Sequence, residues 1–168
     1  VGVSQHQLLH GAGSGALGDL CAHTIDTVRF ITGDEVSEVI GAAMETVIHE
    51  RKILETSGGE ISGRGAATSA KKGPSTVDDI VLFVARMGSG ALATFEATRL
   101  ATGYKNSNRL EIHGDKGAIR FDFERMNELG FYDATLPEKL QGWSTINVTN
   151  GNAQHPYAGA WWPVAHGL

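Results

Sequence analysis

Asp19, His23 and Asp26 are the residues whose types and spacing most readily suggest chemistry. Residues three or four apart in a helix are neighbours on one face, so both carboxylates would lie beside the imidazole. A histidine titrates near neutral pH, and next to carboxylates it can carry a proton during catalysis. The same spacing also fits a solvated helix face with an incidental histidine, and both interpretations stay open at this level.

A metal site would need a third ligand that this helix does not supply. His10, His155 or His166 could provide it, but nothing in the spacing joins them to His23, and we expect no metal. Cys21 falls on the apolar side of the same segment. We therefore interpret Cys21 as a packing residue and not as a nucleophile.

The segment that carries these residues, 17 to 32, has the pattern of an amphipathic helix. Gly33 stands where a C-terminal cap belongs. Asp19, His23, Asp26 and Phe30 fall on one side, and the opposite side is apolar, with Leu17, Leu20, Cys21, Ile25, Val28 and Ile31. We predict a helix that turns its apolar side to a sheet and its acids and imidazole to a cavity.

The glycine run ahead of this helix, Gly13-Ser14-Gly15-Ala16-Leu17-Gly18, matches the G-x-G-x-x-G spacing of dinucleotide sites. That motif requires a buried strand before it, yet residues 4 to 10 are polar. Asp19 would also place a carboxylate where a pyrophosphate should bind. We favour a flexible entry to the helix and assign no cofactor-binding residue.

The rest of the chain is predicted to be mainly strands, at 36 to 48, 77 to 87, 91 to 98, 109 to 113, 118 to 124 and 129 to 132. Gly41 marks a bulge or a break in the first of them. Gly88-Ser89-Gly90 and the turn 114 to 117 make two hairpins, and the nearly continuous apolar run of 77 to 87 predicts a buried strand.

Two stretches lack an apolar period. Residues 52 to 75 combine glycines with charges of both signs, which predicts a long exposed loop. Residues 141 to 168 contain all three tryptophans but no clean pattern, and the chain stops at Gly167-Leu168 without a closing element. We expect a fragment that is truncated at both ends.

Composition limits the possible partners. The formal charge is −5 and glycine accounts for 22 of 168 residues, which argues against nucleic acid or an anionic membrane as a partner and predicts many tight turns. With one cysteine, no leader and no long apolar run, we expect one cytoplasmic domain.

Several motifs together carry a family resemblance. The segment Gly15-Ala16-Leu17-Gly18-Asp19-Leu20-Cys21-Ala22-His23-Thr24-Ile25-Asp26 resembles the D-x-x-x-H segment that opens the C-terminal domain of the Gfo/Idh/MocA oxidoreductases. Further segments resemble that domain in order and spacing: Val77-Asp78-Asp79, Ala97-Thr98-Arg99, Glu111-Ile112-His113-Gly114, Lys116-Gly117, Phe121-Asp122-Phe123-Glu124 and Asn127-Glu128-Leu129. Gly159-Ala160-Trp161-Trp162-Pro163 resembles the tail of a sugar-acting subgroup.

The resemblance implies an α+β fold with an open mixed, mostly antiparallel sheet and helices on one face, similar to the C-terminal domain of glyceraldehyde-3-phosphate dehydrogenase. Residues 11 to 168 would form a substrate-binding and oligomerisation domain, with 1 to 10 unplaced. The family's N-terminal Rossmann domain, which binds NAD or NADP, is absent from this sequence. We therefore expect the fragment alone to be inactive and to form homo-oligomers through the open sheet face.

The resemblance also implies roles for individual residues. His23 would be the acid/base that takes a proton from a sugar or polyol hydroxyl, and Asp19 would hold that hydroxyl or orient the histidine. Tyr104, Trp162 and His166 are candidate substrate-binding residues, although a structural role is favoured for each. Other chemistry on the same fold (an epimerase or a glycosidase) and a non-catalytic binding or assembly module remain alternatives.

Overall fold

The computed structural model describes residues 15–54 and 68–148, and the chain forms two compact units, Val1–Thr102 and Gly103–Leu168. We call them the helix unit and the sheet unit. The helix unit contains η2 (Leu17–Cys21), α1 (Ala22–Thr32), β1 (Val36–Glu45), β2 (Glu50–Leu54), β3 (Thr68–Pro74), β4 (Ile80–Met87) and β5 (Leu92–Thr98). The sheet unit contains β6 (Arg109–His113), β7 (Gly117–Asp122), η3 (Phe123–Arg125), β8 (Glu128–Asp133), η4 (Glu138–Leu140) and β9 (Trp143–Asn147).

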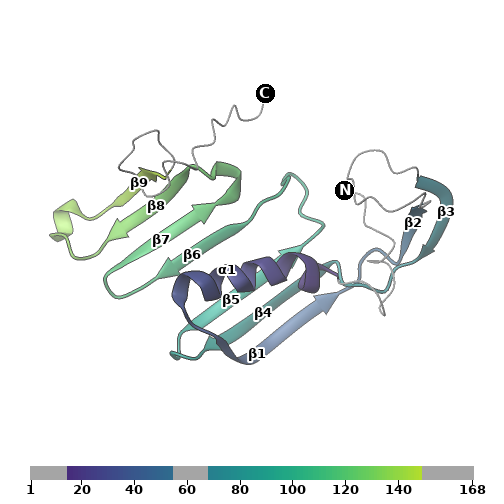
Figure 1. Ribbon diagram of the computed structural model, residues 1–168, viewed down its shortest axis with the longest axis horizontal. Coiled ribbons are helices and arrows are strands. Elements are labelled where there is room, and N and C mark those ends of the chain that lie inside the picture. Colours follow the sequence, from purple (N-terminus) through teal and green to yellow (C-terminus); the bar gives the residue numbers. More distant parts are fainter. Residues whose placement is uncertain (1–14, 55–67, 149–168) are drawn as a thin grey trace. The chain divides into compact units, whose positions relative to one another are not determined.

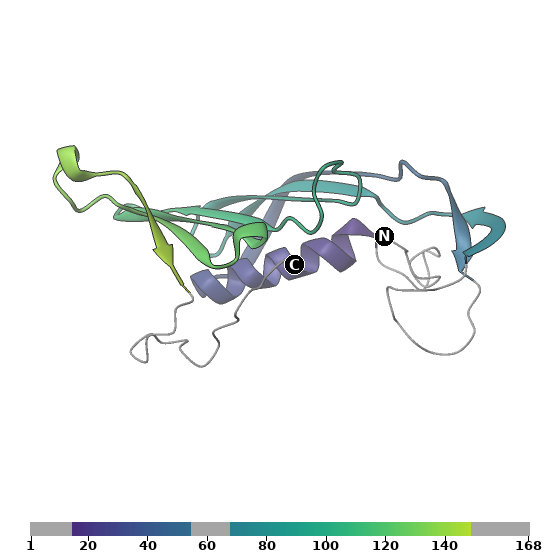
Figure 2. The ribbon, with the colours of Figure 1, turned by 90° about the horizontal axis from the view of Figure 1, so that it is seen from above.

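The predicted α+β class is confirmed. Every strand pairing within the described residues is antiparallel, and α1 is the α-helix that those residues contain. In the helix unit, α1 covers one face of a sheet with strand order β1-β4-β5 (Figures 1 and 2). No helix in the described ranges is long and apolar enough to cross a membrane.

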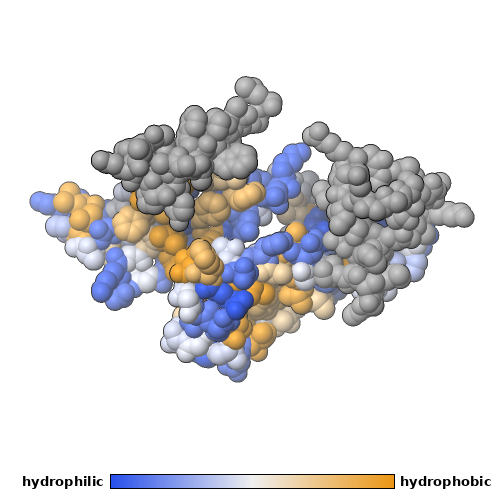
Figure 3. All heavy atoms as spheres, viewed as in Figure 1, coloured by the Kyte–Doolittle hydropathy of each residue, from blue (hydrophilic) through white to orange (hydrophobic). Residues whose placement is uncertain are grey.

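The core of the helix unit lies between α1 and this covered face. Alternate side chains of β4 are buried there, and the Phe83 ring stacks on Phe95 of β5 at a centroid distance of 4.7 Å. Cys21 and Val28 are buried on the helix side. Figure 3 shows hydrophilic residues over much of α1 and hydrophobic residues over the strands beside it.

The prediction that the first hairpin strand is buried is confirmed for one face of β4 and wrong for the other. Leu82 and Val84 of β4 point to the face opposite the buried residues and are 49% and 37% exposed. A continuous apolar run fits two covered faces, but within the described residues of this unit the helix covers one face only. The hairpin itself, with its turn between Met87 and Leu92, is confirmed.

β1 is one long strand with register shifts at Val36/Glu38 and Val39/Gly41, so of the two predicted alternatives the bulge is confirmed and the break is not, and the strand ends at Glu45. The loop predicted at 52 to 75 is partly wrong, because β2 and β3 pair as an antiparallel ribbon. Backbone hydrogen bonds hold such a ribbon without an apolar stripe, so hydrophobic periodicity does not reveal it. Residues 55–67 lie outside the described part of the chain.

The helix predicted at 17 to 32 is also confirmed, with Gly33 capping it at φ 65°. Its first turn differs from the expected α-helix. The Ala22 N–H donates to the Leu17 carbonyl, which is the bond of a π turn and places one additional residue in that turn. Asp19 lies inside this turn.

The sheet unit is an antiparallel meander of order β6-β7-β8-β9 (Figure 1). The second predicted hairpin and the strand at 129 to 132 are confirmed as β6, β7 and β8, whereas β9 was not predicted. The register gathers apolar side chains on one face: Leu110, Ile112, Ile119, Phe121, Leu129, Phe131 and Ile146. We call this set the apolar sheet face, and each of its members is at least partly exposed.

Candidate active site

The two residues with predicted catalytic roles lie near the N-terminal end of the helix. Asp19 belongs to the π turn and is half-buried, with its N–H bonded to the Gly15 carbonyl at 3.1 Å. His23 follows in the first turn of α1 and is exposed. The helix therefore presents the imidazole on its outer side, away from Cys21 and Val28.

Each flanking carboxylate has an arginine partner. The Arg99 guanidinium, just after β5, donates to Asp19, and Arg29 lies 3.5 Å from Asp26. Within the part of the chain that the structure describes, no hydrogen bond joins the His23 ring to either acid. The sequence placed both carboxylates beside the imidazole, but the side-chain contacts of these acids with other described residues run to arginines.

Arg29 makes a stronger contact with Glu35, at 2.6 Å and 2.7 Å through two nitrogens. The hydrogen bonds from Arg29 hold the pKa of Glu35 below its usual value, and those to Glu35 raise the pKa of Arg29. Asp26 is thus a secondary partner of Arg29. This bidentate pair ties the last turn of α1 to the beginning of the strand that follows.

Asp78 occupies the N-terminal end of the helix. Its carboxylate accepts from the Leu17 N–H at 2.7 Å, and its main-chain oxygen accepts from the Ala16 N–H at 2.9 Å. A Cβ on Gly15 would overlap both groups, so Gly15 permits a close approach of the two chain segments. A carboxylate at this position fills the place of an anion, and the described residues do not fit a pyrophosphate site.

Cys21 lies behind this end of the helix and is fully buried. Burial, and secondly the negative charge of Asp78, raise the pKa of its thiol. A thiol whose deprotonation is disfavoured makes a poor nucleophile. The interpretation of Cys21 as a packing residue agrees with this environment.

Asp79, the neighbour of Asp78, is completely buried and forms a hydrogen-bonded junction. Its carboxylate accepts from the N–H groups of Val47 at 2.9 Å and Ile48 at 2.8 Å, and from the Arg51 guanidinium. Its main-chain oxygen accepts from the Arg99 N–H at 3.0 Å. The junction thereby fixes the end of β5 from which the Arg99 side chain reaches Asp19.

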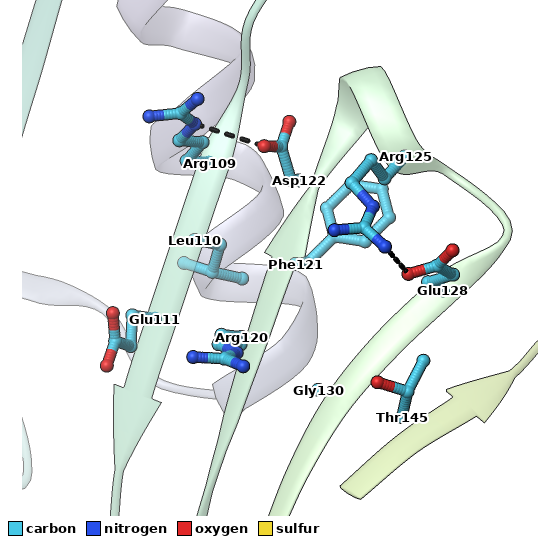
Figure 4. Close-up of a pocket in the computed structure, with 10 residues that line it drawn as sticks. All are labelled: Arg109, Leu110, Glu111, Arg120, Phe121, Asp122, Arg125, Glu128, Gly130 and Thr145. Atoms are coloured by element: carbon cyan, nitrogen blue, oxygen red, sulfur yellow. Dashed lines mark hydrogen bonds and ion pairs between the residues drawn. The ribbon is translucent and has the colours of Figure 1, made fainter. Parts of the chain in front are cut away.

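The described residues of the sheet unit line an open pocket of about 500 Å³ (Figure 4), and its lining includes Leu110 and Phe121 of the apolar sheet face. Two of its arginines are paired, Arg109 with Asp122 at 3.2 Å and Arg125 with Glu128. The third, Arg120, lies above Gly130 and stacks on Trp143 with its guanidinium carbon 4.3 Å from the ring centroid. Neither Asp19 nor His23 lines this pocket.

Tyr104, a predicted substrate-binding residue, also belongs to the sheet unit. Its hydroxyl accepts from Arg109 at 3.2 Å, which raises the pKa of that guanidinium, and the arginine lies over the ring at 4.7 Å. The other two, Trp162 and His166, lie outside the described residues. So do His10 and His155, and the described residues contain no group of three side chains that could hold a metal ion.

Arg99, Asp78 and Asp79 entered the sequence argument only as parts of segments that resemble the family, without roles of their own. Asp79 and Asp19 lie 20 and 80 residues from Arg99, so no local rule joins them. Two consecutive acids at the start of an apolar strand were the available signal. Successive side chains of a strand point to opposite faces, so one of two consecutive acids faces the core. A buried carboxylate requires hydrogen-bond donors or a positive charge beside it.

Fold and site together define an α+β domain in which a helix bearing an Asp–His pair covers one face of an antiparallel sheet. The sequence profile of the GFO/IDH/MocA C-terminal domain matches residues 4–120. The chain belongs to the Gfo/Idh/MocA family.

Known relatives agree with this assignment. Levoglucosan dehydrogenase of Pseudarthrobacter phenanthrenivorans is 39% identical over 153 residues, which are 91% of this chain and 38% of that protein. A crystal structure of an oxidoreductase domain protein from Kribbella flavida aligns with a TM-score of 0.78 at 48% identity, over 99% of this chain and 41% of the other. A structure of levoglucosan dehydrogenase in complex with NADH and levoglucosan aligns at 0.70 and 35% identity, over 94% and 37%. This chain thus spans about two fifths of the length of these relatives.

Proposed function

We propose that this chain is the substrate domain of an NAD(P)-dependent oxidoreductase that acts on a hydroxyl or carbonyl group of a sugar or polyol. The observation that carries the proposal is the Asp19–His23 pair on the outer side of the helix, in a chain 39% identical to a levoglucosan dehydrogenase. A nicotinamide cofactor would be bound mainly by residues outside this chain, because Asp78 already occupies the end of the helix.

In the proposed reaction His23 accepts the proton of a substrate hydroxyl, and a nicotinamide cofactor, when bound, would supply the hydride acceptor for the carbon that bears this hydroxyl. The hydroxyl is thereby oxidised to a carbonyl, and in the reverse direction His23 returns the proton. His23 is exposed on the outer side of the helix, a position from which its ring can meet a substrate. Asp19 accepts a hydrogen bond from a neighbouring hydroxyl of the sugar or polyol and so orients the reacting hydroxyl toward His23.

Tyr104, Trp162 and His166 remain candidates for substrate contacts within this proposal. We further propose that copies of the protein associate through the open sheet face. The apolar sheet face supports this, since it displays partly exposed residues such as Phe131 and Ile146, at 37% and 42% exposure. Analytical ultracentrifugation should then detect a species larger than a monomer, and a strictly monomeric protein would exclude the association.

The experiment is an assay of the complete gene product with levoglucosan and other sugars, with NAD and NADP in parallel. Replacing His23 by alanine should lower kcat by about 10²- to 10⁴-fold while the affinity for the cofactor changes little. His113→Ala is the matched control, because His113 is exposed and lies outside the helix unit. Unchanged turnover in His23→Ala would refute the assignment.

Two alternative functions can be distinguished by experiment. An epimerase or a glycosidase that uses the same proton transfer would convert its substrate without net reduction of NAD, and product analysis distinguishes these enzymes from a dehydrogenase. A non-catalytic binding or assembly module would leave every sugar unchanged. In neither case should this chain alone bind NAD. Saturable micromolar binding of NAD would contradict our interpretation that the glycine run is not a dinucleotide site.

A further inference from the structure

The Arg99–Asp19 ion pair is the contact that distinguishes the candidate acid/base helix from an ordinary exposed helix face. The Arg99 side chain is only 13% exposed, and it crosses from the end of β5 to a carboxylate 80 residues earlier in the chain. We propose that Arg99 is a positioning residue that fixes the Asp19 carboxylate for catalysis. This inference rests on the function proposed above, in which Asp19 orients the substrate hydroxyl.

Arg99 is itself held at two points. Its N–H donates to the main-chain oxygen of Asp79, whose carboxylate is fixed by Val47, Ile48 and Arg51. Immediately after it, the Leu100 N–H donates to the Thr98 hydroxyl at 3.0 Å. The backbone of Arg99 is anchored on both sides, so the residue loses little conformational freedom when its guanidinium binds a carboxylate. The guanidinium can therefore fix the orientation of the carboxylate as well as neutralise its charge.

The exposed arginine pairs of the helix unit lack this environment. In the Arg86–Glu38 pair both side chains are exposed, at 47% and 61%, and their closest atoms lie 3.4 Å apart. Exposed pairs of this kind stabilise a fold very little. Burying Arg99 removes most of its hydration, and the contact with Asp19 offsets that cost. The buried pair therefore constrains Asp19 in a way that the exposed pair does not constrain Glu38.

The helix geometry points the same way. Asp19 lies within the π turn Leu17–Cys21, and π turns are uncommon insertions that often coincide with functional sites. The additional residue changes the direction in which Asp19 leaves the helix relative to His23. Arg99 holds the side chain in that direction, while Asp78 fixes the beginning of the same turn.

The test is a set of variants in the complete gene product, with Arg86→Gln as the matched control for loss of a guanidinium–carboxylate pair. Arg99→Gln should lower kcat about 10- to 100-fold and change KM less than about threefold, because a misplaced carboxylate affects the transition state most. Arg86→Gln should leave both constants within about twofold. Guanidinium ion should partly restore turnover to Arg99→Ala and should not affect Arg86→Ala.

A double-mutant cycle separates positioning from general damage. If Arg99 acts through Asp19, Arg99→Gln should lower kcat less than about twofold when Asp19 is already asparagine. Equal losses in both backgrounds would overturn the inference, as would a kcat for Arg99→Gln that matches Arg86→Gln. Should Arg99→Gln fold poorly, Arg99→Lys replaces it. Lysine keeps the charge, so partial turnover is expected, and full turnover would show that the fork geometry of arginine is not needed.

The wild-type protein and His23→Ala distinguish the two levels of the argument. If the wild-type protein turns over sugar and His23→Ala does not, while Arg99→Gln keeps the wild-type kcat, only the role of Arg99 is overturned. Absence of sugar oxidation or reduction by the wild-type protein with either cofactor overturns the proposed function and, with it, the positioning role.

Discussion

The helix unit and the sheet unit treat the same kind of apolar strand face differently. In the helix unit α1 lies on the covered face of its sheet, and Val81, Phe83, Ala85 and Met87 are buried beneath it. In the sheet unit only Ala118 is buried among the described residues, and the apolar sheet face keeps large side chains partly exposed. Alternation along a strand therefore predicts which face is apolar, but not what covers that face.

The units also treat charge differently. The helix unit buries Asp79 completely and Arg99 nearly so, each with a charged partner. The sheet unit keeps its ion pairs at the surface, where Arg109 is 55% and Arg125 68% exposed. A buried ionic contact resists rearrangement because breaking it leaves a desolvated charge, whereas water compensates a broken surface pair. The candidate catalytic residues lie in the unit with the fixed charges.

The largest expected difference concerns core aromatics. Phe83→Ala should lower the free energy of unfolding by about 4 kcal/mol, because the ring is buried and stacked on Phe95. Phe131→Ala should cost about 1 kcal/mol, since that side chain is already 37% exposed. Urea unfolding with amide exchange on β4 and β8 measures both. If both variants lost the same free energy of unfolding, Phe131 would be as well covered in solution as Phe83 is.

Buried and exposed carboxylates provide the next comparison. Asp79→Asn should destabilise the protein by about 3 kcal/mol, because Arg51 then remains largely buried without its counter-ion. Asp122→Asn, which weakens an exposed pair, should cost no more than about 1 kcal/mol. Denaturant titration of the two variants gives the difference directly. A neutral Asp79→Asn would show that the buried junction does not depend on charge.

Glycines at close approaches should show a smaller contrast. Gly15→Ala should cost about 2 kcal/mol, because its Cβ would overlap both a carboxylate and a main-chain oxygen of Asp78. Gly130→Ala should cost about 1 kcal/mol, since the overlapping group is the side chain of Arg120, which can swing into solvent. Gly142→Ala is the control, with open space around the new methyl group, and should stay within about 0.5 kcal/mol. Thermal melts at one protein concentration rank the three, and a reversed order would contradict the steric argument.

The smallest effect concerns acid titration and should be alike in both units. Hydrogen bonds from Ser89 lower the pKa of Asp34, and those from Thr135 lower the pKa of Asp133, from an ordinary 3.8. A depressed carboxyl pKa stabilises the fold above the ordinary value, and this contribution is lost as the pH falls through the folded-state pKa. Carboxyl-carbon NMR should find both groups titrating below 3.8. Ser89→Ala and Thr135→Val should each raise only the pKa of their own partner, and no change in either variant would contradict the assigned cause.

Sequence reasoning succeeded where the determining interactions are local. The αL cap at Gly33 and the turn at Gly88-Ser89-Gly90 follow from backbone rules over a few residues. It missed β9, a short strand in which every side chain is exposed, because exposure removes the period that reveals a strand. It also missed the pairing of β2 with β3, which backbone hydrogen bonds hold across an intervening segment.

In the candidate site, too, the local features could be predicted from the sequence and the long-range contacts could not. Helical spacing was sufficient to bring Asp19 and His23 to one stretch of helix, but it suggested that the acid would serve the histidine. Among the described residues, Asp19 is bound by Arg99, which follows a strand that the chain reaches much later. The π turn was equally invisible, because no rule for a regular helix anticipates one additional residue.

The stack of Arg120 on Trp143 above Gly130 also has an optical consequence. Trp143, Trp161 and Trp162 are the tryptophans of the chain and Tyr104, Tyr132 and Tyr157 its tyrosines, so the helix unit absorbs near-ultraviolet light only through phenylalanine. Intrinsic fluorescence therefore arises from the sheet unit, and an indole beneath a guanidinium is sensitive to the position of that group. A single tryptophan introduced by mutagenesis near α1 would give the helix unit a tryptophan fluorescence signal of its own.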